Sequence, residues 1–156
     1  MAPKIATTTD VDRTGLDEFL RSRHRGLLIT TRAEGGVQAS PVTCGLGPDG
    51  RILIATYPSR AKTANARRDP AVSIVVISDD WNGPWVQVDG TAEVTDVPDV
   101  PDAVEGLVEY FRCISGEHSD WDEYREAMLR QGKSLIAITP QRWGPIATGG
   151  FPPELA

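Results

Sequence analysis

The chain has 156 residues, a formal net charge of −6 and a sequence pI near 4.9. This length predicts one domain with a core large enough to fold without disulfides. The acidic balance argues against non-specific binding to nucleic acid, which needs a broad basic face. The sequence has neither an apolar signal segment nor a run approaching the ~20 apolar residues that span a bilayer. Cys44 and Cys113 form no C-x-x-C pair. We therefore expect a cytoplasmic protein with reduced thiols and no membrane partner.

The first part of the chain predicts a mobile segment over residues 1–13 and then a helix capped by Thr14. The predicted strands after this helix are 27–32, 37–46, 52–57, 71–78, 85–94 and 134–139. Residues 71–78 are apolar almost throughout, which predicts a strand buried on both faces. Residues 85–94 alternate between apolar and polar, which is typical of a half-buried antiparallel strand.

Two helices are expected between the last two strands. Apolar residues recur at helical spacing from Val104 to Ile114, and Ser119 is a natural N-cap for a second helix. The strand over 134–139 is expected to end before Pro140, and the Gly- and Pro-rich segment 144–156 to be irregular. About six strands, mostly joined by hairpins, favour a mainly β (α+β) fold: a closed or nearly closed antiparallel barrel with helices outside.

The segment "PSRAKTANARRDP" (58–70) concentrates positive charge in an acidic chain. It predicts a helix that starts at Ser59 and ends before Pro70. Arg60 and Lys62 then lie in the first turn, where free N–H groups and the positive end of the helix dipole favour anions over cations. Two cations beside free donors are typical of a phosphate site.

The other two cations of this helix have a simpler interpretation. Arg67 and Arg68 lie at its C-terminal end, where positive charge suits the dipole, and we expect them to be solvated. An ordinary solvated helix remains an alternative for the whole segment.

The strand "ILIATY" followed by "PSRAKTANARRDPAVSIVV" resembles the split β-barrel flavin-binding proteins of the pyridoxamine 5′-phosphate oxidase-like superfamily. Within it, "SRAKTANARRDP" and "GEHSDWDEYREAM" (116–128) resemble the actinobacterial branch that uses the deazaflavin coenzyme F420, the FDOR-B type. The resemblance covers residues 16–140. It implies a single FMN-binding-like split β-barrel and a homodimer with the cofactor at the subunit interface.

The resemblance also implies which residues hold the cofactor. Arg60 and Lys62 would bind its phosphate, with Ser59, Thr63 and Thr56 close by.

The second strand would run beside the flavin or deazaflavin ring. Gln38, Ser40 and Val42 share one face of it by alternation, and Pro41 and Thr43 are their neighbours.

Trp85 is a departure from the FMN-using oxidases, which tend to carry a glutamine there; it weakens the resemblance to them and would supply an apolar wall. Trp81, Trp85, Trp143 or Phe151 of a second subunit would complete the site, or would simply pack in the core or interface.

Hydride transfer is the cofactor's own chemistry, so no catalytic side chain is expected. The two histidines, His24 and His118, do not form a metal-ligand set. The resemblance thus implies a reductase that transfers a hydride from reduced F420 to an electron-poor small molecule, such as an enone, a quinone or a tetrapyrrole. The alternatives are an FMN-dependent enzyme similar to pyridoxamine-phosphate oxidase and a non-catalytic protein that binds or stores F420.

Overall fold

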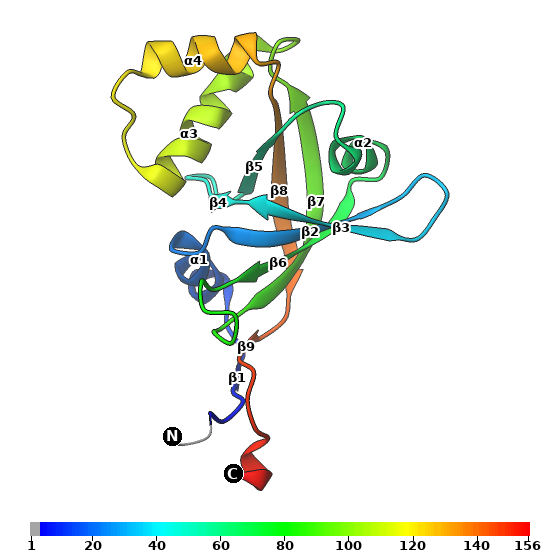
Figure 1. Cartoon of the computed structure of the whole chain (residues 1–156), viewed down its shortest axis with the longest axis vertical. Coiled ribbons are helices and arrows are strands. Elements are labelled where there is room, and N and C mark those ends of the chain that lie inside the picture. The colour runs from blue at the N-terminus through cyan, green and yellow to red at the C-terminus, as the bar shows by residue number, and fades with distance from the viewer. Residues whose placement is uncertain (1–3) are drawn as a thin grey trace.

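The computed structural model describes residues 4–156 and contains a seven-stranded antiparallel sheet. Its strands are β2 (Arg25–Thr31), β3 (Val37–Thr43), β4 (Gly45–Leu46), β5 (Ile52–Thr56), β6 (Ala71–Ile77), β7 (Val86–Asp96) and β8 (Ser134–Trp143). Their order across the sheet is β3-β2-β6-β7-β8-β5-β4. Because Cys44 alone separates β3 from β4, the two ends of the sheet meet and the sheet curls into a half-barrel (Figure 1). The predicted α+β fold with an antiparallel barrel is confirmed.

Four α-helices of the described chain flank this sheet (Figure 1). They are α1 (Arg13–Arg21), α2 (Ala61–Arg68), α3 (Val104–Ser115) and α4 (Trp121–Arg130). The predicted caps Thr14 and Ser119 are wrong: Asp12 and Asp120 cap α1 and α4, and each carboxylate accepts a hydrogen bond from a first-turn N–H, at 2.9 and 3.1 Å. A carboxylate is favoured there because its charge complements the helix dipole. Among residues 4–156, no helix is long and apolar enough to cross a membrane.

Two apolar clusters hold these layers together. Inside the half-barrel, Leu16, Phe19 and Leu20 of α1 pack with the inward-facing residues of the strands. On the outside, α3 and α4 pack over Leu53 of β5 and Leu135 of β8. The helices therefore cover β5 and β8 and leave the outer face of β2, β3 and β6 without a helix above it (Figure 1).

The uncovered face corrects one prediction. Burial alternates along β6: Val72, Ile74 and Val76 are buried, whereas Val75 and Ile77 stay partly exposed. The strand is not buried on both faces, because no helix of the described residues packs on its outer side. The predicted alternation along β7 is confirmed.

Strand β8 does not end before Pro140, as predicted, but continues to Trp143. Pro140 pairs with Gly90 of β7, where the register shifts between Asp89 and Gly90. A proline lacks the N–H that a regular ladder needs, and the irregularity accommodates it. A Cβ on Gly90 would lie 2.3 Å from the Thr139 carbonyl oxygen, so this close approach requires glycine.

The two ends of the described chain pair with each other. Strand β1 (Thr8–Thr9) forms an antiparallel ladder with β9 (Ile146–Ala147), and the pair projects from the sheet (Figure 1). The segment 144–156, predicted to be irregular, thus contains a short strand and a 3₁₀ turn over Pro153–Leu155. Of the segment 1–13 that was predicted to be mobile, residues 1–3 lie outside the described residues and the rest includes β1 and the start of α1.

Candidate functional site

The predicted phosphate site lies where α2 begins, directly after β5. The prediction that Ser59 caps the helix is wrong: Arg60 is the N-cap residue, with extended backbone and no capping hydrogen bond from its side chain. The reason is local, because Arg60 N donates to Tyr57 O at 3.1 Å and closes a turn just before the helix. No side chain therefore caps the N–H groups of the first turn of α2.

Arg60 and Lys62 both lie at this uncapped end. Among residues 4–156, neither side chain makes a hydrogen bond or an ion pair. Lys62 is partly buried, and burial followed by the charge of Arg60 lowers its pKa below the usual lysine value. Two neighbouring cations without a counter-ion repel each other, and a bound anion would relieve both that repulsion and the burial cost. The site is electrostatically suited to an anion.

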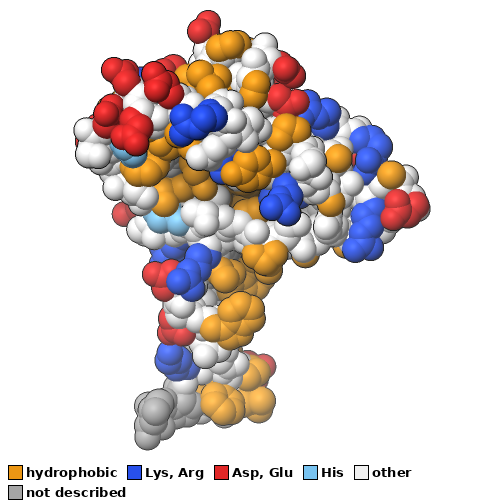
Figure 2. Space-filling view, turned by 45° about the horizontal axis from the view of Figure 1, so that its top comes forward, with side chains coloured by type: hydrophobic (Ala, Val, Ile, Leu, Met, Phe, Trp, Pro, Cys, Tyr) orange, Lys and Arg blue, Asp and Glu red, His pale blue; other side chains and the backbone are white. Residues whose placement is uncertain are grey.

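An open hollow of about 620 Å³ lies beside this end of the helix. It is lined by Tyr57, Pro58, Ser59, Arg60, Gln131 and Gly132, and we call it the α2 hollow. Lys133 lies next to it, with Nζ 4.2 Å from the centroid of the Tyr57 ring. Lys133 follows α4 in the chain, and no local sequence pattern links it to the basic helix. Figure 2 shows Lys and Arg side chains gathered toward α2 and the β2–β3 hairpin, whereas acidic side chains gather over α3 and α4.

Two predicted threonines hold the helix to the sheet. Thr63 Oγ1 donates to Thr56 Oγ1 at 3.2 Å, and the residues are 0% and 4% exposed. This buried contact joins the first turn of α2 to the last residue of β5, which fixes the position of Arg60 and Lys62. A direct contact of either hydroxyl with a cofactor stays a prediction.

Gln38 also contacts α2, through Asn65, a residue that the sequence analysis did not predict to be part of the site. Asn65 Nδ2 donates to Gln38 Oε1 at 3.0 Å and to Thr30 Oγ1 at 3.1 Å. Arg68 Nη2 donates to Asn65 Oδ1 at 2.8 Å and to Thr31 O at 3.0 Å. Arg68, predicted to be solvated, thus belongs to a polar network that joins α2 to β2 and β3.

The other predicted residues of β3 divide between its two faces. Ser40 and Val42 are partly buried on the face of Gln38, whereas Pro41 and Thr43 are exposed on the outer face. Pro41, Val42 and Thr43 line a second hollow of about 420 Å³ together with Trp81; we call it the β3 hollow.

Trp85 lies at neither of these places. It precedes β7, whose other end contacts α2 through the Arg67–Asp96 ion pair at 2.7 Å. The eleven residues of β7 lie between Trp85 and the C-terminal end of α2, which at about 3.4 Å per residue corresponds to roughly 35 Å of strand. Trp85 instead lines a third hollow of about 450 Å³ with Arg142 and Trp143, the Trp85 hollow. Six of the predicted residues therefore line three separate hollows: Ser59 and Arg60 the α2 hollow, Pro41, Val42 and Thr43 the β3 hollow, and Trp85 the Trp85 hollow.

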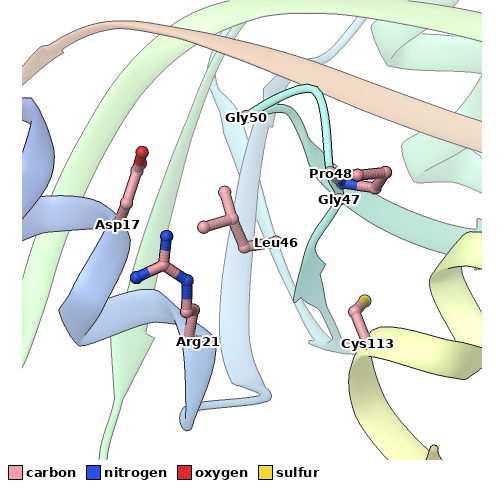
Figure 3. A pocket seen from close by; sticks show the side chains of 7 residues that line it. All are labelled: Asp17, Arg21, Leu46, Gly47, Pro48, Gly50 and Cys113. Carbon is pink, nitrogen blue, oxygen red and sulfur yellow. The ribbon is translucent and has the colours of Figure 1, made fainter.

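A further pocket, of about 340 Å³, contains none of the predicted residues (Figure 3). It is lined by Asp17, Arg21, Leu46, Gly47, Pro48, Gly50 and Cys113, from α1, the β4–β5 turn and α3. Burial raises the pKa of the Cys113 thiol to about 11 and that of Cys44 to about 12. Both thiols are protonated at neutral pH and are poor nucleophiles.

His118 has a local role between α3 and α4. Its Nδ1 accepts from Asp120 N at 2.9 Å, and its ring packs edge-on against Phe111 with centroids 5.1 Å apart. Among residues 4–156, no three His, Cys, Asp or Glu side chains form a group that could hold a metal ion.

Comparison with known proteins identifies the family. A family model described as pyridoxamine 5′-phosphate oxidase matches residues 14–147. The solved structure of the conserved hypothetical protein Rv2991 from Mycobacterium tuberculosis has a TM-score of 0.73 and 22% identity, covering 92% of this chain and 89% of that one. An F420 reductase has a TM-score of 0.61 and 18% identity, covering 82% and 94%. HutZ, the heme storage protein from Vibrio cholerae, has a TM-score of 0.62 and 19% identity, covering 87% and 95%.

At these identities, the similar structures share a fold with the chain and carry no conclusion about its ligand. The family model is stronger evidence, because it spans most of the sequence and includes the sheet, α2 and the α3–α4 pair. The chain belongs to the pyridoxamine 5′-phosphate oxidase family.

Proposed function

We propose that the chain is a reductase that transfers a hydride from reduced F420 to an electron-poor small molecule. The observation that carries the proposal is the pair Arg60 and Lys62 at the uncapped start of α2, which lacks an anionic partner among residues 4–156. A phosphate there would accept hydrogen bonds from the Arg60 fork and from first-turn N–H groups, and would neutralise Lys62.

F420 as the cofactor is supported by sequence and by similarity. Residues 59–70 and 116–128 resemble the F420-dependent branch, and an F420 reductase is among the similar structures. Trp85 weakens the resemblance to the FMN-using oxidases, which tend to carry a glutamine at the corresponding place. FMN is the alternative cofactor, because its phosphate would satisfy the same two cations. Similarity to HutZ supports the other alternative, a protein that binds its cofactor without turnover.

We also propose a homodimer with the cofactor between its subunits. The outer face of β2, β3 and β6 leaves Leu27, Val75 and Ile77 partly exposed, and Trp81 beside it is 79% exposed. An apolar surface of this kind is typical of an interaction site. A second copy on this face would bring its own hollows to those of the first, which supports a site shared between copies.

Reduced F420, when bound, supplies the hydride. The chain holds the phosphate at the start of α2, positions the ring beside β3, and gives the substrate an apolar wall that excludes water. No side chain is proposed as an acid or a base. The acceptor would be an enone, a quinone or a tetrapyrrole, and the reaction would take place in the cytoplasm.

Parallel fluorescence titrations of the purified protein with F420 and with FMN test the proposal. We expect tight binding of F420 and weak binding of FMN, followed by oxidation of reduced F420 when an enone, a quinone or a tetrapyrrole is added. Preference for FMN would keep the phosphate site and reject F420. Binding of F420 without oxidation by any acceptor would favour the storage protein, and binding of neither would reject the site.

A further inference from the structure

The chemistry of Arg68 determines which way the neighbouring Asn65 amide points. A guanidinium can donate hydrogen bonds but cannot accept them. The atom of Asn65 that lies 2.8 Å from Arg68 Nη2 must therefore be its oxygen. The same Nη2 also lies 3.0 Å from the Thr31 carbonyl oxygen, so the guanidinium is held against β2.

The orientation of Asn65 in turn determines that of Gln38. With its oxygen toward Arg68, Asn65 directs both N–H groups away from it, one to Thr30 Oγ1 at 3.1 Å and one to Gln38 Oε1 at 3.0 Å. An amide NH₂ can only donate, so the Gln38 atom at this contact must be its oxygen. Asn65 is 7% exposed and Thr30 is 1% exposed, so water does not compete for these bonds.

This chain of contacts leaves the Gln38 NH₂ group directed away from Asn65. Among residues 4–156, the Gln38 amide nitrogen has no hydrogen-bond partner, although the residue is partly buried. The nitrogen itself is accessible to solvent, because no buried side-chain nitrogen or oxygen of the described residues lacks a partner, and an acceptor of a ligand would take the place of water there. The Gln38 donor is therefore pre-oriented for such a ligand.

The spacing along α2 connects this donor to the phosphate site. Asn65 follows Arg60 by five residues, which corresponds to about 7.5 Å along the helix axis. A flat ring joined to the phosphate by a short polyol chain can span such a distance.

We propose that Asn65 and Arg68 are positioning residues, which orient the Gln38 amide so that its NH₂ donates to a ring carbonyl oxygen or ring nitrogen of the bound cofactor. This inference rests on the proposed function, because it needs a cofactor whose phosphate lies at the start of α2. The inference also requires that the edge of the cofactor ring beside β3 carries a hydrogen-bond acceptor.

The variant Asn65→Asp reverses the polarity of the network with little change in shape. A carboxylate accepts from Arg68 and also from the Gln38 NH₂, so Gln38 rotates and directs its oxygen toward the ring. We expect the affinity for F420 to fall about tenfold, the size of one lost hydrogen bond, and the absorption band of bound F420 to shift. The affinity for inorganic phosphate, which contacts only the start of α2, should not change.

Two further variants separate positioning from a general structural effect. Gln38→Glu places an oxygen beside the ring without touching the buried part of the network, and should weaken F420 binding as much as Asn65→Asp does. In a Gln38→Met background there is no amide to orient, so Asn65→Asp should have no further effect on F420 affinity.

Three results would overturn the inference while leaving the proposed function intact. These are wild-type affinity of both single variants for F420, an equal loss of phosphate affinity in Asn65→Asp, or an undiminished effect of Asn65→Asp in the Gln38→Met background. Failure of the wild-type protein to bind F420 or FMN would instead reject the proposed function and the inference together. Circular dichroism and thermal unfolding confirm that each variant is folded.

Discussion

The two ends of α2 each carry two cations, and the structure uses them differently. At the C-terminal end, Arg67 pairs with Asp96 at 2.7 Å, and Arg68 donates to Asn65 and to the Thr31 carbonyl. At the N-terminal end, Arg60 and Lys62 have no partner among residues 4–156. The eight-residue helix and its N-cap residue Arg60 thus carry one pair of cations that have partners and one pair that have none among residues 4–156.

The difference shows that charge composition alone does not reveal what a basic helix does. Cations at the C-terminal end complement the dipole and have acceptors nearby, so they contribute to the folded state. Cations at the N-terminal end oppose the dipole, and one of them is partly buried. Their cost is offset when an anion binds. We therefore expect substitutions at the first end to change stability, and substitutions at the second end to change ligand affinity.

The largest expected effect comes from removing both unsatisfied cations. In Arg60→Ala/Lys62→Ala, two charge-assisted contacts with phosphate are lost, each on the order of 1.5–3 kcal/mol. The affinity for F420, measured by fluorescence titration, should fall roughly a hundredfold or more, with little change in the unfolding midpoint.

The matched control is Arg21→Ala/Arg67→Ala, which removes the same net charge from sites outside the start of α2. It should lose less than about tenfold in affinity, because neither residue lies at the start of α2 to contact the phosphate and the charges of exposed side chains are partly screened by salt. Equal losses in the two double variants would mean that net charge, and not a phosphate contact, attracts the cofactor.

Substitutions at the C-terminal end of α2, where the cations have partners, should change the stability of the protein. Arg68→Ala leaves Asn65 Oδ1 without its donor at a site that is 7% exposed. We expect the free energy of unfolding in urea to fall by about 1–3 kcal/mol. Arg60→Ala, at the other end, should change it by less than about 0.5 kcal/mol. The comparison between the two ends fails if both variants destabilise the protein equally.

A smaller effect concerns pH. Burial, and secondarily the charge of Arg60, lowers the pKa of Lys62, so Lys62 loses its positive charge at a lower pH than an ordinary lysine. Binding of an anion favours the charged form. The affinity for F420 should therefore decrease by up to about tenfold as pH rises through the Lys62 pKa. Lys62→Arg keeps its charge over this range, and an unchanged pH dependence in that variant would exclude Lys62 as the cause.

The smallest expected effect is a gain in the free energy of unfolding. Arg60→Asp supplies the missing N-cap acceptor and a charge that complements the dipole, so the free energy of unfolding should rise by about 0.5–1 kcal/mol. The same variant should lose cofactor binding. Thermal unfolding of Arg60→Asp beside Arg60→Ala measures the gain; a gain of the same size in Arg60→Ala would show that relief of cation repulsion, not capping, is responsible.

Local signals in the sequence predicted most of the sheet and the start of the basic helix to within one or two residues. The alternation along β7 is a property of neighbouring residues and needs no tertiary information. The cationic first turn of α2 could be found in the same way. Its true N-cap could not, because the turn between Tyr57 and Arg60 overrides the better capping side chain of Ser59.

The remaining features depend on contacts between distant segments. Asn65 in the middle of a helix looks solvent-facing until β2 and β3 are known to pack against it. Pro140 looks like the end of a strand unless Gly90 is known to lie opposite. The uncovered side of β6 is likewise invisible in its apolar sequence, because what is missing there is a helix from elsewhere in the chain.

A crystal structure of the protein with F420 would show whether the start of α2 binds the cofactor phosphate. We expect the cofactor phosphate at the start of α2, within hydrogen-bonding distance of the Arg60 guanidinium and Lys62 Nζ. A bound cofactor whose phosphate lies elsewhere, with Arg60 and Lys62 making no contact to it, would contradict this expectation.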